Sequence, residues 1–281
     1  MNKLSFCYLI FFLFLISCTN DKVTPPKEKV EQAITESKKQ NKPIKNHPDY
    51  TDSSVFPAFL DLDYVMGRFD PTRRVDFQKI DIAYADQEGR YMHKGAYESF
   101  KVMHAAAKKD GINLTIKSAA RNFAYQKGIW ERKWTGATLL EGKENAAKLY
   151  ENHTERAIAI LKYSSMPGSS RHHWGTDIDI NSFNNSYFES GQGKKEFDWL
   201  TANARKFGFC RPYTKLGTDR SSGYQEEKWH WSYTPVANYC TEYARQHLEN
   251  IMFVGFEGSD VAKQINIKDN YILGISSSCK N

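Results

Sequence analysis

Apolar residues recur at helical spacing in several stretches between residues 95 and 250. The first stretch, 95–109, places apolar side chains every three or four positions from Tyr97 to Ala107, which predicts an amphipathic helix. Gly111 follows directly and is typical of a helix end. By the same spacing, further helices are predicted over 125–134, 143–163, 197–207 and 235–250.

Strand signals are short and unevenly spaced along the chain. Residues 112–116 alternate between polar and apolar, and the runs 176–180 and 229–233 predict two more strands. The tail, 261–281, alternates weakly and predicts an edge strand. Because these strands are few and do not alternate regularly with helices, the pattern favours an α+β fold with a small antiparallel sheet flanked by helices.

The first 55 residues differ in character from the rest. An apolar run from Leu4 to Ile16 follows Lys3 and is shorter than the roughly 20 residues of a membrane-spanning helix. Residues 1–17 therefore predict a signal peptide. The string that ends at Cys18 resembles a bacterial lipobox, in which the cysteine receives a diacylglyceryl group. An ordinary signal peptide with an incidental cysteine is the alternative.

Residues 18–55 are rich in Lys, Glu, Asn and Pro, and so predict a flexible linker behind the lipidated cysteine. The folded domain is expected over 56–260. These segments together predict a membrane-anchored lipoprotein of the bacterial cell envelope, on the periplasmic or outer-membrane side, held to the membrane by its N-terminal lipid.

Charge and cysteine content narrow the classes of partner and site. The net charge of +6 is spread along the chain without a basic stripe, so nucleic acid is not an expected partner. Cys210, Cys240 and Cys279 would remain in the mature chain, which allows one disulfide, but the sequence does not choose the pair. None has the C-x-x-C spacing of a structural zinc site. We expect a monomer.

Two polar segments carry candidate chemistry. His172 lies in a loop, seven residues before Asp179 in a predicted strand. His230 lies in the strand 229–233, with the carboxylates Glu226 and Glu227 just upstream. Imidazole and carboxylate are both zinc ligands, and a mixed set is typical of catalytic zinc. By spacing alone, metal binding is one interpretation among several, because such pairs are also common in ordinary polar structure.

Three motifs in order resemble the zinc D-alanyl-D-alanine carboxypeptidases, which include vancomycin-resistance enzymes and related L,D-carboxypeptidases. They are S-x-x-R-(x4)-Q from Ser118 to Gln126, S-x-H-x-x-G-x-x-x-D from Ser170 to Asp179, and E-x-W-H from Glu227 to His230. The resemblance covers roughly residues 59–233. It implies a hedgehog/DD-peptidase-like fold.

The resemblance also implies a function. It indicates a zinc peptidase that removes a terminal D-amino acid, D-Ala, from peptidoglycan stem peptides by means of metal-activated water. D,D and L,D specificity are both open. The alternatives are a peptidoglycan endopeptidase on the same fold and a zinc-binding lipoprotein module without catalysis.

Site residues follow from the matched motif positions. One zinc ion would be held by His172, Asp179 and His230. The catalytic pair would be Glu227, as general base, and Arg121, on the terminal carboxylate or the scissile carbonyl of the substrate. Gln126 and Ser170 would support the substrate or the ligand loop.

Some positions depart from simple patterns. In an ideal strand Glu226, not Glu227, shares a face with His230, so the resemblance requires a bend before the strand. Asp177 stands where the family commonly has a small residue; it is either an acceptor behind a ligand histidine or a solvated strand residue. His173 is interpreted as structural. The long segment 135–166 is expected to shape the substrate groove.

Overall fold

The structure is a computed structural model that describes residues 56–280. The predicted signal peptide 1–17, the lipidation site Cys18 and the linker 18–55 lie outside these residues. Within residues 56–280, no helix is both long enough and apolar enough to cross a membrane.

Short helices and strands make up the described chain. The α-helices are α2 (Leu62–Val65), α3 (Lys94–Lys109), α4 (Phe123–Trp134), α5 (Ala146–Leu149), α6 (His153–Ile160), α7 (Gly191–Asn203), α8 (Thr234–His247) and α9 (Ala262–Ile265). The strands are β1 (Phe77–Lys79), β2 (Tyr91–His93), β3 (Ile116–Ser118), β4 (Asp177–Ile180), β5 (Phe209–Cys210) and β6 (His230–Tyr233). Single turns of 3-10 helix occur at Pro71–Arg73, Ile82–Tyr84, Arg171–Trp174, Asn185–Glu189, Ala204–Phe207, Asn250–Met252, Ser259–Val261 and Ser277–Cys279, and a π-helical turn at Lys268–Ile272.

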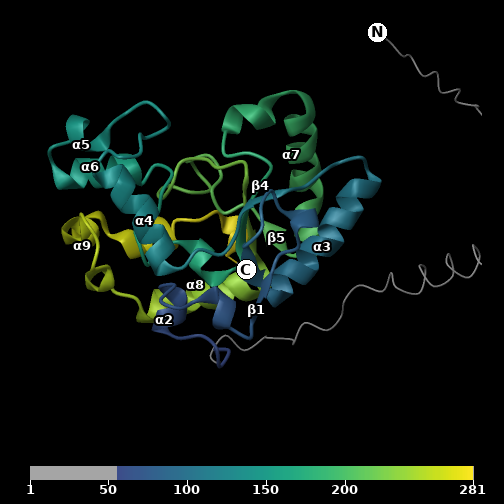
Figure 1. Cartoon of the computed structure of the whole chain (residues 1–281), viewed down its shortest axis with the longest axis horizontal. Coiled ribbons are helices and arrows are strands. Elements are labelled where there is room, and N and C mark those ends of the chain that lie inside the picture. Colours follow the sequence, from purple (N-terminus) through teal and green to yellow (C-terminus); the bar gives the residue numbers. More distant parts are fainter. Residues whose placement is uncertain (1–55, 281) are drawn as a thin grey trace, which may run out of the picture. The chain divides into compact units, whose positions relative to one another are not determined.

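The central sheet has four strands in the order β3-β4-β6-β5, and every neighbouring pair is antiparallel. β1 and β2, which come before β3 in the sequence, form a separate two-stranded antiparallel sheet. In Figure 1 the sheet lies in the middle, with α3 and α7 on one side and α4, α5 and α6 on the other. The predicted α+β architecture with a small antiparallel sheet is therefore confirmed.

Strict alternation along β4 and β6 gives the sheet one apolar and one polar face. Ile178 and Trp231 are paired across the two strands and are buried in the core that α3 covers. Asp179 and His230 are also direct partners in the register, and they point to the opposite face. Burial of the apolar face therefore fixes the register that places these two polar side chains together.

Most predicted helices occur within a few residues of the expected bounds, with two exceptions. The helix predicted over 197–207 begins earlier, as α7, and its last four residues form a 3-10 turn. The stretch 143–163 forms two short helices, α5 and α6, instead of one. Asn152 causes the break, because its side chain accepts hydrogen bonds from the backbone N–H groups of Thr154 and Glu155 and so caps a new helix. The predicted strand 112–116 is displaced toward the C-terminus, to β3.

The predicted edge strand in 261–281 is wrong. The described tail forms α9, the π-helical turn and a final 3-10 turn. Its isoleucines are not alternately exposed: Ile265, Ile267 and Ile272 are all buried in the core that contains residues of α4 and α8. The folded domain therefore continues past the predicted boundary at residue 260.

A disulfide joins Cys210 in β5 to Cys279 in the last turn, which settles the pairing that the sequence left open. Cys240 is a buried free thiol in α8. The bridge ties the tail to the edge strand of the central sheet, next to β6.

Candidate active site

His172, Asp179 and His230 converge on one buried point. Their ligand atoms all lie within 4.8 Å of one another. His172 Nε2 lies 3.3 Å from Asp179 Oδ2, and His230 Nδ1 lies 3.2 Å from Asp179 Oδ1. The structure thus brings together the three residues that the motifs proposed as metal ligands.

A glycine turn returns the loop with His172 toward β4. His172 lies in the 3-10 turn Arg171–Trp174, which ends at Gly175 in the left-handed region at φ 69°. A Cβ atom at this glycine would overlap the Phe77 ring and lie 2.8 Å from the backbone nitrogen of His93. Both the backbone conformation and the close approach therefore require glycine here.

Each imidazole uses its second nitrogen to hold a fixed orientation. His172 Nδ1 donates to the backbone oxygen of Ala119 at 2.9 Å, which leaves Nε2 to face Asp179. His230 Nε2 donates to Asp177 Oδ2 at 2.9 Å, which leaves Nδ1 to face the cavity. Such outer hydrogen bonds fix the tautomer and the ring orientation of metal-binding histidines.

Asp177 is fully buried, so it is the acceptor behind His230 and not a solvated strand residue. Its other oxygen accepts from Ser232 Oγ and from Thr176 Oγ1, each at 2.7 Å. Arg171 Nε lies 3.2 Å from Asp177 Oδ2 and is itself buried. The guanidinium also donates to Ser232 Oγ, at 2.9 Å, so the carboxylate is held from several sides.

The donor set fits a divalent cation. Asp179 Oδ1 is buried, and among residues 56–280 no donor is aligned to hydrogen-bond to it. His230 Nδ1 lies 3.1 Å from Glu227 Oε2 as well as close to Asp179, yet a ring nitrogen can donate only one proton. Two carboxylates that crowd one imidazole nitrogen in a buried site are satisfied if a cation stands between them. Two nitrogens and one oxygen suit zinc.

Glu227, not Glu226, faces this point. The Glu227 side chain is 7% exposed, and burial raises the pKa of its carboxyl group. The Glu226 side chain is 26% exposed and pairs with Arg211 at 3.0 Å. Strand alternation fails here because β6 begins only at His230, whose backbone N–H bonds to the Glu227 carbonyl across a turn. This is the bend that the motif required.

Burial and charge also set the state of the two candidate ligand imidazoles. Burial lowers the pKa of His172, and the nearby Arg121 lowers it further. Burial would lower the pKa of His230 as well, but Asp177, Asp179 and Glu227 outweigh it and raise this pKa well above the usual value. His172 is therefore a neutral donor, and His230 binds a proton in the metal-free site.

The other predicted residues have different roles. Arg121 lines the cavity, and its Nε is buried without a hydrogen-bond partner among the described residues. Ser170 also lines the cavity, and its buried hydroxyl has no hydrogen-bond partner in the part of the chain that the structure describes. Gln126 is not among the residues that line it, and its Nε2 donates to the Ser165 backbone oxygen at 2.8 Å, which supports this loop.

His173 has the structural role expected of it. Its Nδ1 donates to the backbone oxygen of Arg121 at 2.5 Å, and its Nε2 accepts from the backbone N–H of Gly168 at 3.1 Å. Burial lowers the pKa of His173 to about 3, so the ring is neutral and can make both bonds. These two bonds connect Arg121, in the S-x-x-R-(x4)-Q motif, to the loop at Gly168, just before the motif that begins at Ser170.

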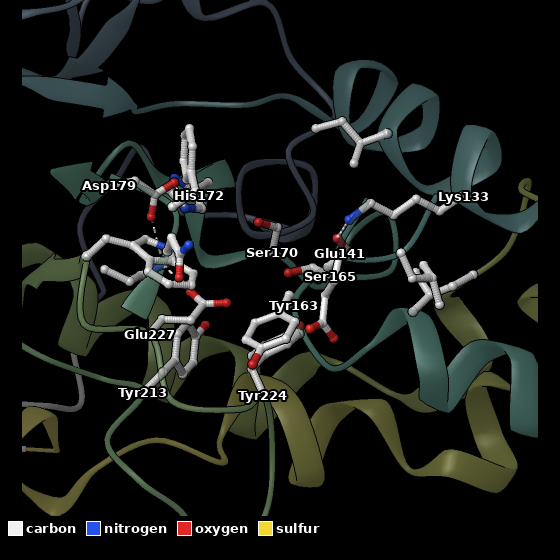
Figure 2. A pocket seen from close by; sticks show the side chains of 18 of the residues that line it. Lys133, Glu141, Tyr163, Ser165, Ser170, His172, Asp179, Tyr213, Tyr224 and Glu227 are labelled. Carbon is white, nitrogen blue, oxygen red and sulfur yellow. Dashed lines mark hydrogen bonds and ion pairs between the residues drawn. The ribbon is translucent and has the colours of Figure 1, made fainter. Parts of the chain in front are cut away.

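The cavity has a volume of ≈ 670 Å³. Figure 2 shows Asp179, His172 and Glu227 at one end, and Lys133, Glu141 and Tyr163 farther along it. The segment 135–166 supplies Leu140, Glu141, Ile160 and Tyr163 to the wall, as expected of a segment that shapes the groove.

Sequence reasoning missed several side chains of the wall, among them Lys133, Tyr213 and Tyr224. The Tyr213 ring lies 4.6 Å from the His230 ring, centroid to centroid. Tyr213 and Tyr224 belong to the irregular segment between β5 and β6, where no periodicity marks a face. Lys133 lies in α4 and resembles an ordinary solvated lysine in the sequence.

A buried pair of imidazoles with a carboxylate, and a second carboxylate beside them in a substrate-sized cavity, defines the class of metal-dependent hydrolases. A family model described as VanY, D-alanyl-D-alanine carboxypeptidase, matches residues 89–236. The chain belongs to this carboxypeptidase family.

Individual proteins show the same similarity. The chain is 26% identical over 234 residues to the "Putative carboxypeptidase YodJ" of Bacillus subtilis, a match that covers 75% of this chain and 78% of that protein. It is 29% identical over 131 residues to a "D-alanyl-D-alanine carboxypeptidase" of Enterococcus faecalis, over 47% of this chain and 44% of that protein.

Solved structures with a similar fold include VanYB in complex with D-alanine-D-alanine, at a TM-score of 0.43 and 23% identity, over 62% of this chain and 85% of that one. The LD-carboxypeptidase LdcB aligns at a TM-score of 0.45 and 22% identity, over 73% of this chain and 81% of that one.

Proposed function

We propose that this carboxypeptidase is zinc-dependent and removes a terminal D-alanine from peptidoglycan stem peptides. The observation that carries the proposal is the position of Glu227, buried against His230 in the same cavity as the unpartnered Arg121. The same cavity thus contains a candidate base, a candidate metal site and a positively charged side chain that can bind the substrate. The membership in the VanY family and the similarity to the enterococcal enzyme support the D-alanyl substrate.

His172, Asp179 and His230 would hold one zinc ion. When bound, zinc supplies Lewis-acid chemistry that makes water a nucleophile near neutral pH and polarises the scissile carbonyl. Glu227 Oε2 accepts the proton of the attacking water and then returns it to the leaving amine. A pKa raised by burial suits this exchange, because the same carboxyl group must act first as base and then as acid.

Arg121 and Ser170 would bind the leaving residue. The guanidinium offers donors in a planar fork that matches a carboxylate. The Ser170 hydroxyl is buried and unpartnered in the same wall, so it is available to a substrate oxygen. Polar groups that are buried without a partner commonly mark the positions that a ligand completes.

Loss of D-alanine from defined stem peptides tests the proposal. Purified protein would be loaded with zinc, its metal content measured, and pentapeptide and tetrapeptide stems digested and analysed by mass spectrometry. Release from the pentapeptide means D,D activity, and release from the tetrapeptide means L,D activity. Zinc-loaded protein that releases alanine from neither would contradict the proposal, and cleavage of a crosslinked dimer alone would favour an endopeptidase.

We further propose that the protein is a monomer anchored in the bacterial cell envelope by a lipid on Cys18, which follows the signal-peptide pattern. Metabolic labelling with a fatty-acid analogue tests the anchor. Label should be incorporated by the native chain and lost in Cys18→Ala, which should leave the membrane fraction. A label that persists in the variant would refute this site of lipidation.

A further inference from the structure

Lys133 is a charged wall residue of the cavity that none of the three motifs includes. It lies in the last turn of α4, half-buried, and its Nζ donates to the hydroxyl oxygen of Ser164. Over residues 56–280 no carboxylate lies within ion-pair distance of this ammonium group. A half-buried lysine without an acidic partner is costly, because the one hydrogen bond to Ser164 replaces only part of the hydration that the charge loses.

Arg121 lines the same cavity as Lys133 and shares its lack of an acidic partner among the described residues. Across the part of the chain that the structure describes, its guanidinium has no acidic partner, and its Nε has no hydrogen-bond partner. Lys133, Arg121 and Glu227 line one cavity. Burial lowers the pKa of Lys133, the charge of Arg121 lowers it further, and Glu227 and Glu141 oppose both.

Two cations without anionic partners on one side of Glu227 form a receptor for an anion. In Figure 2, Ser170 and Ser165 lie between Lys133 and the His172–Asp179 pair along the cavity. A substrate whose scissile bond lies at Glu227 would therefore extend its leaving residue past Ser170 toward Lys133. The one charge that every carboxypeptidase substrate has at this end is the α-carboxylate of the leaving residue.

We propose that Lys133, held by Ser164, binds the terminal α-carboxylate of the substrate together with Arg121. The proposal rests on the carboxypeptidase function proposed above and deepens it. Lys133 would be a specificity residue that makes the enzyme require a free C-terminus. Ser164 keeps the ammonium group in place, and Gln126 in turn holds the adjacent Ser165 backbone oxygen. One helix, α4, thereby supplies both the lysine and the support for its serine.

Kinetics on two matched peptides test this role. The peptides end in D-Ala-D-Ala and differ only in a free or an amidated C-terminus. For Lys133→Met, KM on the free acid should rise about 10- to 100-fold, as expected when a charge-assisted hydrogen bond is lost. The preference for acid over amide should fall by the same factor, with kcat changed much less. Lys133→Arg should retain most of the preference.

Lys148→Met is the matched control. Lys148 lies in α5, is exposed and does not line the cavity, so its loss should leave the acid preference unchanged. Zinc content and melting temperature should be equal in all variants. An unchanged preference in Lys133→Met, or an equal loss on both peptides, would overturn the proposal.

The test also separates this inference from the proposed function. If the native protein binds zinc but releases alanine from neither these peptides nor a tetrapeptide stem, the peptidase function fails. Calorimetric binding of the two peptides to the uncleaving protein then still decides the role of Lys133. Tighter binding of the acid that disappears in Lys133→Met would support the carboxylate receptor, and equal binding of acid and amide would reject it.

Discussion

Glu226 and Glu227 are neighbours in the chain but have opposite environments. The turn before β6 directs Glu227 to His230 and leaves Glu226 at the surface with Arg211. Two adjacent carboxylates therefore differ in burial and hydration because the backbone directs them to opposite sides. At the scale of single residues, function depends on which atoms each side chain can reach, and less on its chemical type.

The base assignment predicts unequal effects of removing the two charges. Glu227→Gln should lower kcat by about 10²- to 10⁴-fold, the usual contribution of a positioned base. Zinc content should be retained, because the three proposed ligands are intact. Glu226→Gln, the matched control, should stay near native activity, because it breaks only a partly exposed ion pair worth about 0–1 kcal/mol. Steady-state kinetics with metal analysis checks both, and the reverse order of effects would assign the base to Glu226.

The bond between Asp177 and His230 predicts an effect on metal affinity. Asp177→Asn replaces the acceptor of His230 Nε2–H with an amide that can be oriented either way, so Nδ1 is less firmly directed at the metal. Zinc affinity should fall about 10- to 100-fold, as for other second-sphere changes. Competition with a chromophoric chelator measures it. Asp198→Asn, at an exposed ion pair with Lys194, should leave affinity unchanged.

Metal affinity should also depend on pH through His230. In the metal-free site three carboxylates raise the pKa of His230 despite its burial, and the proton on Nδ1 competes with a cation. Affinity should therefore rise with pH through and above the ordinary imidazole value of about 6.5, and fall on acidification. Chelator competition over a pH series checks this. A constant affinity over that window would show that no proton leaves His230 on binding.

At the scale of elements, alternation within β4 and β6 separates packing from chemistry. Ile178 and Trp231 hold the sheet against α3, while Asp179 and His230 occupy the other face of the same two strands. This part was predictable from sequence, because apolar periodicity marks the strands and the motifs mark the polar positions. The break between α5 and α6 was not, since a capping asparagine is a weaker stop signal than glycine or proline.

The turn at Gly175 predicts a loss of stability on substitution. Gly175→Ala forces a left-handed residue to carry a Cβ against Phe77 and the His93 backbone. Gly111→Ala is the control: Gly111 also has positive φ, at 74°, but no atom of residues 56–280 lies within 4 Å of its Cβ position. Gly111→Ala should cost about 1–2 kcal/mol from the backbone alone, and Gly175→Ala about 1–3 kcal/mol more from overpacking. Denaturant unfolding compares the two variants. Equal losses in the free energy of unfolding would show that the Phe77 ring moves aside without an energetic penalty.

At the scale of the whole molecule, the tail and the site are parts of one structure. The buried isoleucines of the tail complete the core shared with α4 and α8, and the Cys210–Cys279 bridge fastens the tail to β5. The sequence did not reveal this, because a tail packed by irregular turns has neither helical nor strand periodicity. The positions of Tyr213 and Lys133 were hidden for a similar reason, since they depend on long-range contacts.

The bridge closes a loop of 69 residues that contains β6 and His230. Its loss should lower the free energy of unfolding by about 2–4 kcal/mol, chiefly by freeing the unfolded chain. Reductant should therefore destabilise the native protein and leave Cys279→Ser unaffected. Thermal unfolding with and without reductant measures both. If reductant destabilised the serine variant equally, the effect would come from something other than this bridge.

Because Asp179 and His230 are direct partners across β4 and β6, the proposed metal site forms only when these two strands are correctly aligned. A slip of one residue between β4 and β6 would set Asp179 opposite a tryptophan and turn it toward the apolar face. Such a misaligned molecule would have no cation site at this point. Zinc would then stabilise only the correctly registered form, by an amount that grows with free metal concentration. Free metal would thus increase the fraction of correctly aligned molecules before any substrate binds.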